Sequence, residues 1–234
     1  MKLLDKIRRK WAQYRGGEYY LDFLRKQGVT IGKNCTIGPP KTIEIDLTRP
    51  CLVEIGDNVR MLKGFTLLTH DFVTAAFITR YGEFLSSSGK VKIGNNVYFG
   101  RNCTVLKGVT IGDNVIVGYG SIVTKDIPSN SVCVGSPARV ICTMDEYFEK
   151  RKVECVEEAK EYAREIVKKS GRYPVPADFR EEFGLFCSGD EIDKYPDIPI
   201  RYQLSRNGGC YDRWVKQHES LFRDFDEFLK SAGL

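Results

Sequence analysis

Bulky apolar residues recur at every sixth position along two stretches of the chain. The first stretch has Ile31, Ile37, Ile43, Ile55, Met61 and Leu67 in phase, with Arg49 as the polar exception. After residue 72 the phase is lost, and it resumes with a shift of two at Ile93, Phe99, Val105, Ile111, Val117 and Val123. Many of these residues are followed by a glycine, as at Gly32, Gly56, Gly94 and Gly112.

A six-residue period fits neither an amphipathic helix nor an ordinary two-sided strand, and it is typical of a prism with three flat sides. One side chain per hexapeptide then points inward and stacks on its counterpart in the next coil, and parallel strands pair between coils about 4.8 Å apart. We expect the glycine after the inward residue to turn the corner, because it tolerates both the backbone conformation and the crowding there. The alternative is an unrelated Val/Ile/Gly-rich β domain.

The N-terminal segment predicts an amphipathic helix. Residues 2–15 place Leu4, Ile7, Trp11 and Tyr14 on one face, with basic side chains around the rest. We interpret this helix as a cap over the open end of the prism, where strand edges would otherwise stay unpaired. The alternative is contact with an anionic membrane surface.

The chain after residue 142 predicts a helical extension. Thr143 and Glu146 form a capping box before a helix that runs towards Gly171. The apolar stripe of this helix consists of Val156, Ala159, Ala163 and Ile166. After a Pro-interrupted stretch, a last helix near 211–231 is predicted, with Trp214, His218, Leu221, Phe225 and Phe228 at helical spacing. Such an aromatic stripe is typical of packing, so we interpret His218 as structural.

Composition narrows the class of protein. The 234 residues are 42% hydrophobic and 29% charged, which excludes wholesale disorder. The net charge of +5 is confined to residues 1–30, so no basic face for nucleic acid is expected. The sequence lacks a membrane-spanning apolar run and a signal peptide, and we therefore expect a cytoplasmic protein. Its eight cysteines show no CxxC spacing, which favours reduced, mostly buried thiols over a disulfide set.

The segment of residues 93–141, IGNNVYFGRNCTVLKGVTIGDNVIVGYGSIVTKDIPSNSVCVGSPARVI, resembles the hexapeptide-repeat acyltransferases. The resemblance covers residues 29–142, and its most specific parts are GSIVTKDIP, GSPARVI and the THDF that precedes residues 73–91. These motifs are similar to the sugar and xenobiotic O-acetyltransferase branch. The resemblance implies a mainly β chain with a left-handed parallel β-helix, a homotrimer with active sites between subunits, and acetyl-coenzyme A as co-substrate.

The predicted domains are therefore a helical cap (1–28), a β-helix acyltransferase domain (29–142) with loop 72–91 inserted, and a helical extension (143–234).

His70 is the first candidate for chemistry. Acetyl transfer to a hydroxyl needs a base for the hydroxyl proton, and an imidazole suits that task near neutral pH. The chain has only two histidines, and His70 lies where the first run of repeats stops. The resemblance implies that His70 is the catalytic base, whereas the residues alone also allow a loop histidine bound to a backbone carbonyl. The neighbouring Asp71 could orient the imidazole or cap the loop.

The candidates for coenzyme binding lie on two late coils. Small residues there would let the pantetheine arm approach the backbone. By resemblance, these candidates are Tyr98, Gly100, Gly118, Tyr119, Gly120, Ser121, Thr124, Lys125 and Arg139. Lys125 and Arg139 could meet the phosphates, although each alone is typical of solvated surface. The family commonly has Trp at Tyr98 and a small residue at Arg101, which puts contacts by Arg101 in doubt.

Residues 72–91 break the prism, and a loop of this length is usually functional. The resemblance implies that this loop helps form the acceptor pocket, for which our candidates are Asp71, Arg80 and Tyr81. We expect a sugar or glycan-precursor hydroxyl as acceptor. An amino sugar or an antibiotic as acceptor, or a non-catalytic scaffold, are the alternatives. A three-histidine zinc centre is excluded because the repeat region contains one histidine, and no metal is expected.

Overall fold

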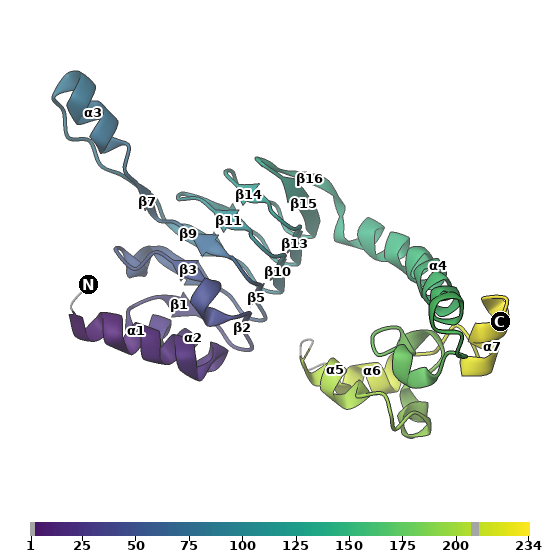
Figure 1. Ribbon diagram of the computed structural model, residues 1–234. Helices are drawn as coiled ribbons and strands as arrows, with labels where there is room; N and C mark the ends of the chain where they lie inside the picture. The colour runs from purple at the N-terminus through teal and green to yellow at the C-terminus, as the bar shows by residue number, and fades with distance from the viewer. Residues whose placement is uncertain (1–2, 207–210) are drawn as a thin grey trace. The chain divides into compact units, whose positions relative to one another are not determined.

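The computed structural model describes residues 3–206 and 211–234 and divides into two compact units, Met1–Tyr147 and Phe148–Leu234. The first unit contains a three-sided stack of coils (Figure 1). Consecutive short strands belong to different sheets, because the chain passes from one side to the next in each coil. The structure is 42% helical, so the expectation of a mainly β chain was too strong.

Three sheets form the sides of the stack, and in each one strands from successive coils pair in parallel. The first sheet contains β1 (Thr30–Ile31), β4 (Val53–Ile55), β9 (Val91–Ile93) and β12 (Thr110–Ile111). The second contains β2 (Thr36–Ile37), β5 (Arg60–Met61), β10 (Val97–Phe99), β13 (Val115–Val117) and β15 (Ser131–Gly135), with β16 (Ala138–Thr143) added antiparallel. The third contains β3 (Glu44–Ile45), β6 (Thr66–Leu67), β11 (Thr104–Val105) and β14 (Ile122–Val123).

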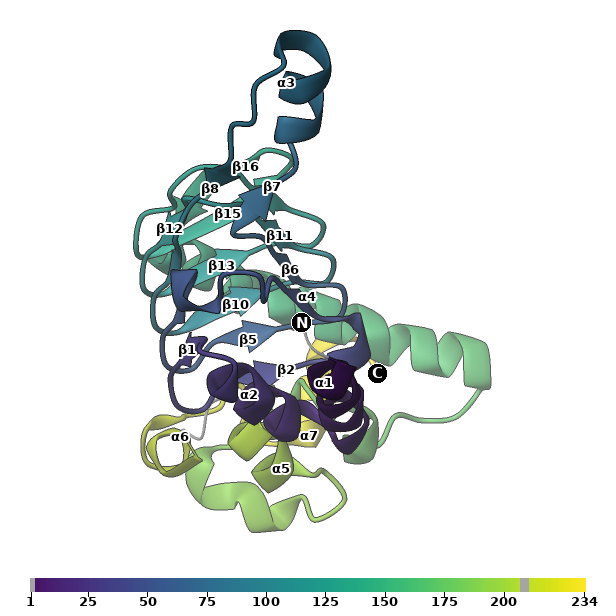
Figure 2. The ribbon, with the colours of Figure 1, turned by 90° about the vertical axis from the view of Figure 1, so that its left-hand side faces the viewer.

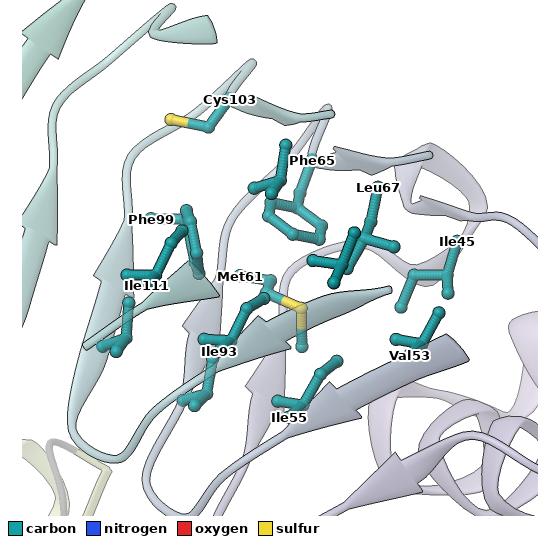
Figure 3. Close-up of a cluster of buried hydrophobic side chains, with 14 of the residues drawn as sticks. Ile45, Val53, Ile55, Met61, Phe65, Leu67, Ile93, Phe99, Cys103 and Ile111 are labelled. Carbon is teal, nitrogen blue, oxygen red and sulfur yellow. The ribbon is translucent and has the colours of Figure 1, made fainter. Parts of the chain in front are cut away.

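The predicted stacking of in-phase residues is confirmed for most of the repeats. Ile55 pairs with Ile93 and Leu67 pairs with Val105, and all four side chains are buried. Figure 3 shows Ile55, Leu67 and Ile93 in the interior of the prism. Ile43 is the exception, because Ile45 takes the place beside Leu67. A 3-10 turn at Pro40–Thr42 lengthens that corner, so the inward position moves by two residues.

The corners correct one expectation about glycine. The Gly56 position is crowded as predicted, since a Cβ there would lie 2.6 Å from the Gly94 carbonyl oxygen of the next coil. The glycines that follow the inward residues are not left-handed. That backbone conformation occurs at Gly64, Gly108 and Gly120 and at six asparagines with φ 55–59°: Asn34, Asn58, Asn96, Asn102, Asn114 and Asn130. Asparagine tolerates this region and adds side-chain hydrogen bonds between coils. Asn96 Nδ2 donates to Asn114 Oδ1 at 2.8 Å, and Asn114 Nδ2 donates to Asn130 Oδ1 at 2.9 Å.

Two helices precede the first coil, α1 (Leu3–Arg15) and α2 (Gly17–Lys26). The second, which the sequence did not predict, packs against β1 and β2 through the buried side chains of Tyr20, Leu21, Phe23 and Leu24. The apolar face of α1 was expected to make this contact, and that expectation is wrong. Leu4, Ile7, Trp11 and Tyr14 are 65%, 56%, 56% and 78% exposed.

The insertion after the sixth strand forms a stalk. β7 (His70–Asp71) and β8 (Ser87–Ser88) pair antiparallel, and α3 (Thr74–Tyr81) lies at the far end of the excursion, away from the prism (Figures 1 and 2). The repeat resumes at β9, as the return of the six-residue phase predicted.

The helical extension begins as predicted. The Thr143 hydroxyl accepts from the Glu146 amide at 3.2 Å, the Glu146 carboxylate accepts from the Thr143 amide, and α4 (Met144–Ser170) ends before Gly171 at φ 67°. The second unit continues with 3-10 turns at Pro176–Asp178, Phe183–Leu185 and Gly189–Lys194, then α5 (Ile200–Arg206), α6 (Tyr211–Gln217) and α7 (Phe225–Ser231).

The last predicted helix is two helices, because Asp224 starts a new one. Its carboxylate accepts from the Glu227 amide at 2.8 Å as an N-cap. In the break between α6 and α7, His218 Nε2 lies 2.7 Å from the Gly184 carbonyl oxygen and its ring stacks on Trp214. These contacts give His218 the structural position that the sequence predicted.

Four of the seven described cysteines are buried, and Cys51 is exposed. Burial raises the pKa of Cys133 and of Cys187 to about 11. Cys210 lies outside the described residues.

Among the described residues, none of the helices combines the length and the apolarity that crossing a bilayer requires.

Candidate active site

A buried carboxylate holds the imidazole of His70. Asp46 follows β3 and is 8% exposed, and its Oδ2 lies 2.6 Å from His70 Nδ1. Four further donors surround this carboxylate. The Thr48 amide and hydroxyl donate to Oδ1 at 2.8 and 2.7 Å, and the Thr69 amide and hydroxyl donate to Oδ2.

These contacts determine the charge of Asp46. Burial raises the pKa of the carboxyl, but the hydrogen bonds from Thr69, Thr48 and His70 outweigh burial and hold the pKa well below its usual range. Asp46 is therefore ionised near neutral pH. A carboxylate can only accept, so the proton of a neutral His70 resides on Nδ1, and Nε2 keeps its lone pair. The His70 side chain is 16% exposed.

Backbone pairing fixes the position of this pair. Asp46 N donates to the Leu67 carbonyl, which continues the ladder between β3 and β6 beyond the strands. His70 begins β7 and pairs with Ser88. The imidazole is thus attached to the root of the stalk, and its ring lies edge-on to the ring of Phe72 at 5.0 Å between centroids.

Asp71 points into the stalk and away from the imidazole pair. Its carboxylate accepts from Lys107 Nζ at 2.8 Å, from the Ser87 hydroxyl at 3.2 Å and from the Val73 amide at 3.2 Å. The hydrogen bond from Lys107 lowers the pKa of Asp71. Of the two roles left open by the sequence, these contacts are those of loop capping.

The corner before β14 contains four of the coenzyme candidates, and Gly100 lies beneath them in the corner one coil earlier. A Cβ at Gly100 would lie 2.8 Å from the Tyr119 amide nitrogen, so only glycine fits there. Gly120 has φ 68°, and a Cβ on it would point into open space. Tyr119 is 71% exposed, and its hydroxyl accepts from Asn102 Nδ2 at 3.1 Å.

Gly118 and Ser121 face the inside of this corner. The fully buried Ser121 hydroxyl donates to the Gly118 carbonyl at 2.7 Å and accepts from the Gly135 amide at 3.1 Å. Both bonds are internal, so the Ser121 side chain shapes the corner, and a coenzyme contact by this residue stays a prediction that burial disfavours.

The remaining coenzyme candidates lie on other parts of the last coils. Thr124 and Lys125 follow β14 and are exposed. Tyr98 projects outward from the middle of β10, and Arg139 is exposed on β16, where its Nη1 donates to the Ala138 carbonyl. Arg101, whose contacts the sequence left in doubt, accepts from the Gly120 amide through its carbonyl oxygen.

The acceptor candidates Arg80 and Tyr81 lie at the end of α3. Arg80 Nε donates to the Tyr81 hydroxyl at 2.9 Å, and its guanidinium lies over the Tyr81 ring. Tyr81 is exposed, as are the nearby apolar residues Phe84 and Leu85.

The candidates therefore form two groups, at opposite ends of the strands in the third sheet. His70 follows β6, at the same end of the strands as Thr124 and Lys125, whereas Tyr119 and Gly120 precede β14. His70 also belongs to the second coil and β14 to the fourth. The strand pairing places two spacings, about 9.6 Å, between them along the stack.

Sequence reasoning missed Asp46, Thr48 and Thr69. Asp46 lies 24 positions before His70, whereas a coil of three hexapeptides has 18 residues, so a strict count does not pair them. The available signal was an acid directly after Ile45, which alternates with Ile43, just before the in-phase position that holds Arg49.

Comparison with known proteins agrees with the repeat. The family described as bacterial transferase hexapeptide (six repeats) matches residues 90–125. Protein CapG of Staphylococcus aureus is 38% identical over 130 residues, which cover 54% of this chain and 72% of CapG. This chain belongs to the hexapeptide-repeat transferase family. The galactoside O-acetyltransferase of Escherichia coli K12 is 40% identical to this hexapeptide-repeat transferase over 131 residues, or 54% of the chain and 62% of the relative.

Solved structures similar to this hexapeptide-repeat transferase include a maltose O-acetyltransferase from Clostridium difficile 630. The two sequences are 28% identical, and the match covers 61% of this chain and 89% of the maltose O-acetyltransferase chain, with a TM-score of 0.41. A galactoside acetyltransferase in complex with coenzyme A is 27% identical, covers 60% of this chain and 80% of its own, and has a TM-score of 0.41. The match to the curated Escherichia coli relative spans less than two thirds of that protein's length.

Proposed function

We propose that this protein transfers an acetyl group from acetyl-coenzyme A to a hydroxyl of a sugar or glycan precursor in the cytoplasm, with His70 as the general base. The observation that carries the proposal is the Asp46 carboxylate 2.6 Å from His70 Nδ1. The names of its relatives, a galactoside and a maltose O-acetyltransferase, favour a sugar hydroxyl over an amine.

His70 Nε2 takes the proton of the acceptor hydroxyl as the oxygen attacks. Asp46 keeps the opposite nitrogen protonated and stabilises the imidazolium that forms. Hydrogen bonds from Thr48 and Thr69 hold the carboxylate in place, so no reorganisation is needed when charge develops on the ring. Bound acetyl-coenzyme A would supply the thioester carbonyl that the hydroxyl attacks. The C–S bond breaks once the new C–O bond has formed, and the His70 imidazolium would return its proton to the departing thiolate of coenzyme A.

The residues of the last coils fit a coenzyme. The space that a side chain on Gly120 would enter is open, because residue 120 is a glycine. The exposed Tyr119 ring borders the same corner. Lys125 and Arg139 offer positive charge for phosphates. Ser121 would contribute through the backbone shape it maintains.

We further propose a homotrimer of left-handed β-helices with active sites between subunits. The support is the separation described above, since one chain carries His70 and Tyr119 at opposite ends of the strands in the third sheet. A neighbouring copy would bring the second group to the first. The stalk, with Arg80 and Tyr81, would then reach the acceptor, and Asp71 would hold its root. The helical cap, β-helix and helical extension remain the proposed division of the chain.

Thermal unfolding with acetyl-coenzyme A tests the donor. A ligand at about 100 times its dissociation constant stabilises the folded state by about 2.7 kcal/mol, and ADP should not reproduce the resulting shift in unfolding temperature.

Release of coenzyme A in the presence of galactosides or maltose tests the reaction. His70→Gln should lower turnover by about 10²–10⁴-fold at unchanged donor affinity. His218→Gln, a matched control, should leave turnover unchanged. Full turnover in His70→Gln contradicts the mechanism, and an absent shift favours a scaffold.

A further inference from the structure

The outward face of α1 carries apolar side chains between basic ones. At about 100° per residue, Leu4, Ile7, Trp11 and Tyr14 lie within one narrow arc of the helix. Lys10 borders this arc on one side, with Lys6 beyond it. The residues on the other side are Arg15 and Arg8.

Contacts of the opposite face hold α1 in this orientation. Ala12 is buried, and Gln13 Nε2 donates to the Pro40 carbonyl at 3.2 Å. Because α2 fills the end of the prism, the first coil leaves the apolar arc of α1 uncovered. More than half of the surface of each of its four side chains is exposed.

The aromatic residues of this face lie against cationic side chains. The Trp11 ring lies edge-on to Tyr19, and the Arg15 guanidinium covers both rings at 5.1 and 4.4 Å from their centroids. Arg15 Nη2 also donates to the Tyr19 hydroxyl at 2.6 Å. Tryptophan, tyrosine and arginine in this arrangement are typical of side chains at a membrane–water boundary.

The positive charge around this face of α1 indicates which kind of surface it binds. Residues 1–30 hold eight of the 36 basic and three of the 31 acidic side chains, which leaves 28 of each for the rest of the chain. A second copy docked through its own α1 would bring two positive faces together, and a neutral surface would desolvate Lys10 and Arg8 without a counter-charge. An anionic lipid surface supplies both phosphates and an apolar layer.

We propose that α1 is a peripheral membrane anchor, which lies on anionic phospholipid with Leu4, Ile7, Trp11 and Tyr14 in the headgroup–acyl boundary. The binding is independent of the proposed transferase activity. It places the protein at the surface of an anionic bilayer, so that a lipid-linked acceptor would be within reach.

Vesicle co-sedimentation of the full-length protein tests this anchor. We expect binding to phosphatidylcholine vesicles that contain phosphatidylglycerol and weak binding to phosphatidylcholine alone, with a fall in partition as salt rises. In a Trp214→Phe background the only tryptophan left is Trp11, whose emission should shift to shorter wavelength with the anionic vesicles.

Matched variants separate the apolar and electrostatic contributions. Ile7→Asp should reduce partition at least about tenfold, whereas Val153→Asp, at an exposed aliphatic on α4, should not. Lys6→Glu with Lys10→Glu should reduce it about 25-fold or more, at about fivefold for each lysine lost. Lys168→Glu with Lys169→Glu is the control for the same change of charge.

Circular dichroism and thermal unfolding confirm that the variants fold. The charge variants alter exposed side chains only, so they keep the test valid if Ile7→Asp unfolds. Equal binding of the α1 variants and the wild type overturns the proposal, as does equal affinity for both kinds of vesicle. Absence of vesicle binding also overturns it, and loss of self-association in Ile7→Asp would then assign the face to a second copy.

Discussion

Asp46→Asn removes the negative charge beside His70 and keeps the size of the side chain. An asparagine offers one accepting oxygen to the donors that now converge on two carboxylate oxygens. If that oxygen faces Thr48, the amide nitrogen faces His70 Nδ1 and donates to it. The ring proton then moves to Nε2, and the base is lost.

The size of the effect follows from these contacts. A hydrogen bond to a charged group contributes about 1.5–3 kcal/mol, or roughly 10–10²-fold in rate. The wrong tautomer in a comparable acid–histidine pair costs about 10⁴-fold. We therefore expect turnover to fall between about 10²- and 10⁴-fold. The KM for acetyl-coenzyme A should change little, because Asp46 is buried beneath the imidazole.

The assay is initial-rate release of coenzyme A with saturating donor and a galactoside or maltose acceptor. Asp57→Asn is the matched control. Asp57 Oδ1 accepts from the Lys33 amide in an intercoil ladder, where Asn95 makes the equivalent contact one coil later. This control should keep its turnover. His70→Gln combined with Asp46→Asn should be no slower than His70→Gln alone. Turnover within about threefold of wild type in Asp46→Asn would refute the assignment of Asp46.

Two further predictions concern stability. Gly100→Ala places a Cβ 2.8 Å from the Tyr119 amide, so unfolding should become easier by about 1–3 kcal/mol, whereas Gly38→Ala, with 3.5 Å to its nearest neighbour, should be close to neutral in denaturant titrations. The lowered pKa of Asp46 predicts acid sensitivity. Its carboxylate stabilises the fold fully above the ordinary aspartate pKa of about 3.9, and this stabilisation is lost as pH falls towards the lower folded pKa. The difference in unfolding free energy between the wild type and Asp46→Asn should therefore shrink below about pH 4, and an unchanged difference would contradict the assigned ionisation.

The limits of sequence reasoning are visible at particular residues. The six-residue period predicted the coils because each inward residue meets an equivalent residue one coil later, as Ile55 meets Ile93. The same count failed at Ile43, where a 3-10 turn adds residues to the corner. It also failed at Asp46, whose distance along the chain from His70 depends on the irregular corner that contains the 3-10 turn at Pro50–Leu52.

The apolar face of α1 shows the other limit. Helical periodicity identified Leu4, Ile7, Trp11 and Tyr14 as one face, but periodicity does not say what a face contacts. The second helix is itself amphipathic, which is a signal that the sequence prediction missed, and Tyr20 and Leu24 of that helix occupy the end of the prism instead.

By itself, the sequence determined the repeat and the capping box of Thr143 and Glu146, because each depends on neighbours at short, regular spacing. His70 became the candidate base through the resemblance of the repeat to a known family and because the chain has only two histidines. Only the tertiary structure decided which carboxylate holds the imidazole, at which end of the strands in the third sheet each candidate lies, and which helix covers the first coil. The physical reason is that these contacts join residues from different coils and helices. Their register depends on the lengths of irregular corners, which no periodic pattern records.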